Sequence, residues 1–484
     1  MDGTYLLIGI IVLHCVLFFL DVLFKSCCHL PYVYFVQKTG LEVSFLRLHW
    51  HTTAFNRLFQ QWSNWRPRLL AFWFSLGVIV SLPLMPVAAF LVLRGLFGSI
   101  LDGSKDKPSG FELEPVVPGI NLPMSQLGNY MTALAIGGIL HEFGHALAAG
   151  REGISILGCK AHLIVVLPVA AVEISTQRIN SLATWRRLRI LCAGVWHNVV
   201  LSLLALMLLY AISHSHLYKL DQGVVVTSVD PNSGVAGPSG LLYGDHITGL
   251  NHCKVQDKVS YRNCLYKAAK QSQTDYCVPV SFTNRNTQTT TDTPCCSGEM
   301  LQHLCFHNRN KAGETARWCM QVREVVEASI PKQSDEGCPE GSVSLTPLME
   351  PSALNGTRLV VIKRSNLKKP SVLFLGLPSE LYHTVEISNW LPAASYLSPQ
   401  YPEMFYNFFS YLAALSAGLA LLNMLPCYGF DGQHIMFLLS EVVLGWCGVR
   451  SSTITSMVAG GFTAVGTSCL LAWLFTAICK IIPM

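Results

Sequence analysis

Long apolar runs separated by polar connectors dominate the chain. Six runs, near 4 to 24, 69 to 97, 129 to 150, 190 to 213, 406 to 425 and 454 to 479, approach or exceed the roughly 20 residues that a bilayer-spanning helix needs. Two shorter apolar stretches, 158 to 172 and 433 to 447, have the length of re-entrant segments. This pattern predicts a polytopic α-helical membrane protein.

The polar connectors divide the chain into five predicted regions. The first apolar run follows Met1-Asp2-Gly3 rather than a basic segment, so we expect a retained anchor and not a cleaved signal peptide. The run 69 to 97 is long enough to bend at Pro83 and Pro86. The predicted order is an anchor and connector (1 to 68), a span and loop (69 to 128), the first half of a membrane core (129 to 220), a soluble domain (221 to 391), and the second half of the core with the C-terminal spans (392 to 484).

Two segments are predicted to contain strands. Residues 223 to 227 and 358 to 362 are rich in β-branched residues and lie near the two ends of the soluble domain. The run Leu163 to Pro168 is short and β-branched, which predicts a re-entrant strand, with a short buried helix as the alternative. Non-helical backbone at membrane depth must be buried in protein or line a wet cavity, so such a strand would lie beside a functional site.

Composition agrees with a membrane protein. Hydrophobic residues make up 51% of the 484 residues and charged residues only 13%, against about 25% charged in soluble domains. The net charge of +5 is scattered along the chain and forms no dense basic face. Nucleic-acid binding is therefore excluded as a function class.

The 17 cysteines are unevenly distributed. Eight lie in one polar stretch, a predicted insertion at about 252 to 345, where they are Cys253, Cys264, Cys277, Cys295, Cys296, Cys305, Cys319 and Cys338. An even, dense set in a soluble segment predicts disulfides and a lumenal or extracellular compartment, whereas a cytosolic zinc module would be expected to show paired C-x-x-C spacing, which this stretch lacks. The glycosylation sequon at Asn355 indicates the same compartment.

Charge next to the fourth run predicts orientation. Arg178, Arg186, Arg187 and Arg189 precede residue 190, which puts that end of the run in the cytosol and residue 214 onward on the other side. The run 129 to 150 would then enter from the lumen and carry its C-terminal half toward the cytosolic leaflet.

His141-Glu142-Phe143-Gly144-His145 is the main candidate for chemistry. Glu142 is the only formal charge between Met131 and Gly150. Histidines at i and i+4 project from one helix face about 5–6 Å apart, close enough to share a metal ion, and the intervening glutamate reaches a water at that metal. The alternative, a pair of satisfied core histidines, does not explain why costly polar groups stand in an apolar run.

A catalytic zinc site usually needs a third protein ligand. Asp431 is the leading candidate because it follows the run 406 to 425, which ends in the same leaflet. A solvated helix-capping role is the alternative for this aspartate, and His434 is a rival ligand. His197 and Asn198 form another polar pair, which either has a functional role or joins helices by hydrogen bonds.

These motifs resemble the site-2 proteases, which are intramembrane zinc metalloproteases. His141 to His145 matches the HExxH motif of that family, Asn423 to Gly432 matches N-x-x-P-x-x-x-x-D-G, and Gly194 with Asn198 matches Gly-x-x-x-Asn. Residues 223 to 247 look like the start of a PDZ domain. The resemblance covers nearly the whole chain and implies a helical membrane protein with a short re-entrant β element and an inserted PDZ-like α/β lumenal domain.

The resemblance also implies roles for individual residues. His141, His145 and Asp431 would hold one Zn²⁺ ion, with Glu142 as the general base. The unwound substrate would be bound by a set that comprises Asn198, Asn423, Pro426, Leu163, Val165 and Leu167. The implied substrates are membrane-anchored transcription factor precursors, such as sterol regulatory element-binding proteins and stress sensors of the endoplasmic reticulum, cut after a first lumenal cleavage.

The implied setting is the Golgi or endoplasmic reticulum membrane, with lipid but no nucleic acid as a further partner. The PDZ-like domain would act as a size filter or bind the new carboxyl end. A catalytically inactive scaffold for client helices is the alternative, but the intact Glu142 disfavours it. A transporter is a third possibility, and the internal repeat usual for that class is missing.

Overall fold

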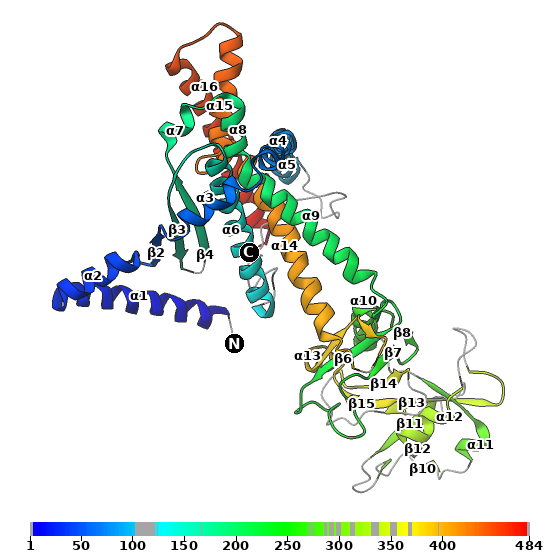
Figure 1. Ribbon diagram of the computed structural model, residues 1–484. Coiled ribbons are helices and arrows are strands. Elements are labelled where there is room, and N and C mark those ends of the chain that lie inside the picture. The colour runs from blue at the N-terminus through cyan, green and yellow to red at the C-terminus, as the bar shows by residue number, and fades with distance from the viewer. Residues whose placement is uncertain are drawn as a thin grey trace. The chain divides into compact units, whose positions relative to one another are not determined.

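The computed structural model divides into two compact units, which we describe separately. The core unit comprises Met1–Ser213 and Tyr406–Met484, and the insert unit comprises His214–Phe405 (Figure 1). The predicted soluble domain, 221 to 391, lies inside the insert unit. The structure describes residues 3–101, 122, 124–165, 167–270, 273, 275–284, 288–289, 295–296, 302–309, 315–330, 338–348, 356–365, 370–394 and 396–481.

Five described helical stretches are long and apolar enough to cross a membrane. They are Ile8–Cys27, Pro67–Gly98, Ala193–Ser213, Gln400–Met424 and Ser452–Cys479. The remaining predicted run, 129 to 150, forms α6 (Leu127–Arg151), a continuous helix of 25 residues that carries the HExxH motif and is not among the five. The chain is therefore a polytopic helical membrane protein, as predicted.

The second stretch is broken as its prolines predict. Helix α4 (Pro67–Ser81) ends just before Pro83, and α5 (Leu84–Leu101) follows. Proline has no backbone N–H to continue the helical bonds.

The other helices of the core unit are α1 (Gly3–Cys27), α2 (His29–Thr39), α3 (Asn56–Asn64), α7 (Thr176–Asn180), α8 (Thr184–Leu191), α9 (Ala193–Ser213), α15 (Asp431–Trp446) and α16 (Ser452–Ile481). Helix α14 (Gln400–Met424) begins in the insert unit, and a 3-10 turn at Met124–Gln126 precedes α6.

Helix α6 lies at the centre of the core unit. It packs along α9 and also contacts α3, α4 and α8. Helix α16 packs against α5 and α15. The short stretch predicted at 433 to 447 is this α15, a helix of 16 residues, which spans about 24 Å.

An antiparallel sheet flanks α6. Its strands are β1 (Leu41–Ser44), β2 (Arg47–Thr52), β3 (Ile156–Ile164) and β4 (Leu167–Ile174), in the order β1-β2-β3-β4. The prediction of one strand at 163 to 168 was wrong, because β3 ends at Ile164 and β4 begins at Leu167. Apolar and polar residues alternate from Cys159 to Leu163, so the strand begins well before the β-branched run, and the chain reverses where Val165 adopts φ +56°.

The two faces of this sheet differ in polarity. Arg47 donates to His162 on the neighbouring strand, and the rings of His49 and His162 stack 4.4 Å apart. Lys160 donates to Glu173 at 2.6 Å, which holds the pKa of the Glu173 carboxyl below its usual value. These side chains share one face because alternate residues of a strand point the same way. The opposite face is apolar and lies toward α6.

The described residues of the insert unit form two larger sheets and a two-stranded ribbon. The first sheet has the order β15-β14-β7-β6-β16, with β8 paired to β7, and the second has the order β10-β12-β11-β13-β9. The strands are β5 (Tyr218–Lys219), β6 (Val224–Val229), β7 (His246–Leu250), β8 (Cys253–Lys254), β9 (Tyr276–Pro279), β10 (Gln288–Thr289), β11 (His303–Arg309), β12 (Thr315–Gln321), β13 (Ser342–Leu348), β14 (Arg358–Arg364), β15 (Val372–Gly376), β16 (Val385–Ser388) and β17 (Leu391–Pro392). The helices are α10 (Lys258–Lys270), α11 (Val280–Thr283), α12 (Val322–Ala328) and α13 (Pro378–Thr384).

Strand β14 lies between two hydrophobic cores. Val360 and Ile362 belong to the core of the first sheet with α10 and α13, whereas Leu359 and Val361 belong to that of the second sheet. Both faces are covered, which explains why the sequence here is a continuous apolar run. The two strands predicted at 223 to 227 and 358 to 362 are confirmed as β6 and β14.

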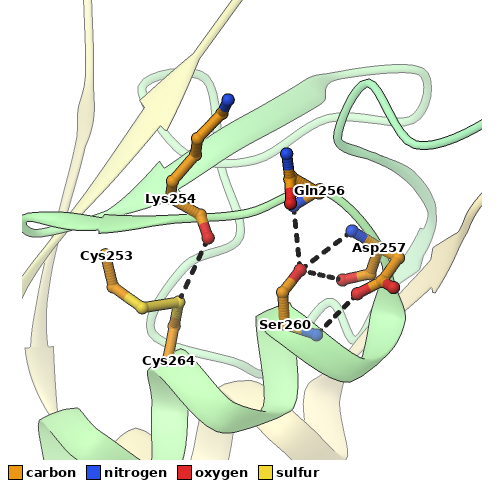
Figure 2. Close-up of a disulfide and its surroundings, with 6 residues drawn as sticks. All are labelled: Cys253, Lys254, Gln256, Asp257, Ser260 and Cys264. Carbon is orange, nitrogen blue, oxygen red and sulfur yellow. Dashed lines mark hydrogen bonds between the residues drawn. A yellow bond between two sulfur atoms is a disulfide. The ribbon is translucent and has the colours of Figure 1, made fainter.

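All eight clustered cysteines form disulfides. The pairs are Cys253–Cys264, Cys277–Cys338, Cys295–Cys305 and Cys296–Cys319. The first joins β8 to α10, which begins with a reciprocal cap (Figure 2). Asp257 Oδ1 accepts the backbone N–H of Ser260 at 2.6 Å, and Ser260 Oγ accepts that of Asp257 at 2.9 Å. The bond from Ser260 holds the pKa of the Asp257 carboxyl below its usual value.

The predicted glycosylation site Asn355 lies outside the described residues.

Candidate metal centre

Three side chains predicted as metal ligands converge in the core unit. Asp431 Oδ2 lies 3.0 Å from His141 Nε2 and 3.1 Å from His145 Nε2, and the two nitrogens are 3.2 Å apart. Both histidines are more than nine-tenths buried. The structure thus brings together residues separated by almost 300 positions, and within the described residues no other His, Cys, Asp or Glu group has this arrangement.

Glycines allow α6 and α9 to approach at this point. A Cβ on Gly194 would stand 2.4 Å from His145 Nε2 and 2.6 Å from His141 Nε2. A Cβ on Gly144 would meet the Ala193 carbonyl oxygen at 2.7 Å. Gly194 therefore keeps open the space in front of the two histidine nitrogens that face Asp431.

His145 is oriented from the end of α8. Its Nδ1 donates to the Ile190 carbonyl at 2.8 Å, which leaves Nε2 as the ligand atom. Glu152, just after α6, pairs with Arg186 and with Arg189 of α8, the latter at 3.1 Å, and its side chain is 2% exposed. This buried carboxylate fixes α8 against the end of α6 and so positions the Ile190 carbonyl.

His141 is oriented by Asn198 of α9. The Asn198 side chain is fully buried, and its Nδ2 lies 3.1 Å from His141 Nδ1, while its Oδ1 is buried without a hydrogen-bond partner. The oxygen and nitrogen of an amide are nearly indistinguishable by shape. If His141 ligates a metal ion through Nε2, its Nδ1 carries a proton and donates a hydrogen bond. With the amide oxygen and nitrogen of Asn198 exchanged, Oδ1 would accept that bond. The substrate-binding role of Asn198 stays a prediction, and its position beside His141 Nδ1 also suits it to orient that ligand.

Asp431 is the first residue of α15. The turn from α14 brings Gly432 against the Leu425 carbonyl oxygen, where a Cβ would stand 2.1 Å away. Only glycine fits there, which explains the Asp-Gly pair in the motif. A carboxylate at a helix N-terminus is favoured by the helix dipole.

Glu142 points to the edge of the sheet. Its Oε2 accepts the backbone N–H of Val172 in β4 at 2.8 Å. This bond orients the carboxylate next to the histidine pair. Strand β4 pairs only with β3 in the described sheet, so its other edge faces α6.

The remaining predicted residues lie outside the group of three ligands. His434 is exposed on α15 and outside the ligand group. His197 Nδ1 donates to the Ala193 carbonyl at 2.8 Å, a contact within α9. Pro426 lies in the turn between α14 and α15 with its carbonyl against Gly466 of α16, and Asn423 is half-buried at the end of α14. Leu163 and Leu167 flank the hairpin tip at Val165.

The sequence interpretation missed two contributions from the N-terminal region. Strands β1 and β2 come from the segment predicted as a connector, although Arg47 to His51 alternates polar and apolar residues. His14, in the first apolar run, is 3% exposed, and its Nε2 donates to the Val165 carbonyl at 2.9 Å. An ionisable residue within an apolar run was the available signal.

The donor set fits zinc. Two imidazole nitrogens and one carboxylate oxygen are the ligand types of hydrolytic zinc sites, and three protein ligands leave a fourth position open. Their mutual separations of 3.0–3.2 Å are close to the edge of about 3.4 Å in a tetrahedron with ~2.1 Å ligand distances. Because Gly194 has no side chain, the space beside the two histidine nitrogens stays free for the ion.

Comparisons with known proteins agree with this geometry. Residues 129–467 match peptidase family M50. The chain is also 24% identical over 422 residues to the membrane-bound transcription factor site-2 protease homolog of Arabidopsis thaliana, an alignment that covers 76% of this chain and 80% of that protein. The matched range includes His141 and His145 as well as Asp431.

Proposed function

The chain belongs to peptidase family M50, the family of the site-2 proteases, and from this premise we propose that it hydrolyses peptide bonds within transmembrane segments at a zinc centre of His141, His145 and Asp431. Family membership makes it an intramembrane metalloprotease. The observation that carries the residue assignment is the convergence of these three ligand atoms within 4.8 Å of one another.

The protein's own groups can perform the remaining chemistry. Zinc supplies Lewis acidity, which polarises a carbonyl and makes water acidic enough to act at neutral pH. Glu142 takes the proton from the attacking water and delivers it to the leaving amide nitrogen. The Val172 N–H holds Glu142 Oε2 in place for both transfers.

The edge of β4 supports a mode of substrate binding. An amide in a transmembrane helix is hydrogen-bonded and shielded, so the segment must unwind before attack. An unwound segment can add to the open edge of a sheet, where main-chain groups supply hydrogen bonds. In this proposal β4, rather than the 163 to 168 strand predicted from sequence, receives the substrate, because β4 carries the contact to Glu142.

The polar face of the sheet supports access for water. His49, His51, Lys160 and His162 stand on the face opposite α6. Such groups are costly in contact with lipid, so this face of the proposed re-entrant element borders an aqueous space. Hydrolysis requires water at the site.

The name of the Arabidopsis relative supports the substrate class. The proposed substrates are membrane-anchored transcription factor precursors, of the sterol regulatory element-binding and stress-sensor kinds, cut after a first lumenal cleavage. The disulfides support a lumenal, PDZ-like insert unit in the Golgi or endoplasmic reticulum. With the arginines before residue 190 in the cytosol, the zinc centre lies near the cytosolic leaflet.

Cleavage by the purified protein tests the proposal. Detergent-solubilised protein is incubated with a trimmed single-span precursor, and the products are mapped by mass spectrometry. The proposal expects a cut inside the membrane segment that a zinc chelator abolishes and added zinc restores. Binding of the precursor with no cut, with or without zinc, would favour the scaffold alternative.

A further inference from the structure

An apolar groove lies between α6 and the sheet. Its volume is about 250 Å³, several times the roughly 30 Å³ that one water occupies in the liquid. One wall is Ala135, Gly138 and Ile139 of α6, and the others come from all four strands of the sheet, including Leu48, Trp50 and Leu163. The lining is almost wholly aliphatic and aromatic, and His49 and His162 are its only residues with polar side chains.

The groove begins one helical turn from Glu142. Residues three, four and seven positions apart share one face of a helix, so Ile139, Gly138 and Ala135 face the same side as Glu142. The rise of 1.5 Å per residue places Gly138 and Ala135 about 6 and 10 Å from Glu142 along the axis. On the opposite wall, Ala170 and Pro168 continue the strand that contacts Glu142 through Val172.

The groove is open to an incoming side chain. A Cβ on Gly138 would meet no atom within 4 Å, and Ile139 is 58% exposed. Neighbouring Gly137 differs, because its Cβ would meet Leu419 of α14 at 3.1 Å. The space over Gly138 is therefore a feature of the sheet side of α6 and not of its helix-packing side.

We infer that this groove binds one large apolar side chain of the substrate, two or three residues from the scissile bond. An extended chain advances about 3.3 Å per residue, so a substrate strand lying along β4 with its scissile bond at Glu142 brings that residue over Gly138. The inference rests on the proposed function and adds a specificity site to it. The N-terminal segment supplies part of this site through Leu48 and Trp50.

Filling the groove gives a direct test. Gly138→Leu places a side chain in the open space, and Gly128→Leu is a matched control on the same helix, where a Cβ also meets no atom within 4 Å. Each variant is assayed with substrates that carry leucine or alanine at each position within three residues of the cut.

Wild type and Gly128→Leu should prefer leucine over alanine at one such position by roughly tenfold or more in kcat/KM. Gly138→Leu should lose or reverse that preference, because its kcat/KM should fall further for the leucine substrate than for the alanine substrate. A wild type without preference at any of these positions, or an equal loss on every substrate in Gly138→Leu, would overturn the inference.

A binding measurement separates this inference from the proposed function. In the Glu142→Gln background, Gly138→Cys should form a disulfide with a cysteine placed at the preferred substrate position, whereas Gly128→Cys should not. Cross-linking without cleavage by the wild type would support the groove as a binding site and contradict the proposed protease activity. Cleavage by the wild type without cross-linking or side-chain preference would support the protease activity and contradict the groove.

Discussion

At the scale of single residues, the arrangement separates metal ligands from the groups that orient them. His145 is oriented by a backbone carbonyl, and His141 by Asn198. The HExxH motif predicted the ligand pair because helical spacing alone puts both histidines on one face. The role of Asn198 could not be predicted in this way, since it depends on how α9 packs against α6.

Asn198 provides a prediction about metal affinity. Asn198→Ala should lower zinc affinity by roughly 10- to 100-fold, the usual effect of losing a partner of a ligating histidine. Asn198→Asp should retain most of the affinity, because a carboxylate oxygen can accept the His141 Nδ1 proton. Competition with a fluorescent chelator measures both variants. An aspartate variant as weak as the alanine variant would contradict the orienting role.

At the scale of elements, the β3–β4 hairpin is fixed at both ends. Glu142 holds Val172 in β4, and His14 of α1 holds the tip at Val165, a β-branched residue in the left-handed region. Such a conformation is unfavourable and persists only when its surroundings impose it. The sequence predicted β structure here but misplaced it, because a β-branched run does not reveal where the chain reverses.

His14 therefore gives a second prediction. His14→Leu should release the hairpin tip and raise KM for the substrate several-fold while zinc content stays near that of wild type, since the ligands lie on other elements. His14→Gln keeps an N–H donor and should restore much of the affinity. Steady-state kinetics in detergent, with zinc analysis of the same samples, would show the split. Unchanged kinetics in His14→Leu would exclude the hairpin-anchoring role.

At the scale of the whole molecule, two compact units differ in the chemistry that stabilises them. The core unit has apolar helices, whereas the insert unit has four disulfides across two sheets. The sequence predicted cysteine pairing from an even, clustered set, but eight cysteines allow 105 connectivities, so the pairs required the fold. Strands β6 and β14 were predictable because their apolar runs are long and β-branched.

The proposed compartment can be tested in sealed microsomes. The insert unit should resist added protease, Asn355 should carry a glycan removable by an endoglycosidase, and reductant should change the mobility of the protected fragment. These results would place residues 221 to 391 in the lumen and the zinc centre near the cytosolic leaflet. Digestion of the insert in intact vesicles, with its eight thiols open to alkylation before reduction, would invert the topology.

Cleavage and zinc content measured together in Glu142→Gln and Asp431→Ala test the central claim most directly. Glu142→Gln should hold zinc near the wild-type stoichiometry and lose at least about 10²-fold in cleavage rate, because Glu142 moves the proton and does not hold the metal. Asp431→Ala should lose zinc and cleavage together, because it removes one of three ligands. A Glu142→Gln variant that cleaves at a rate close to wild type would contradict the account.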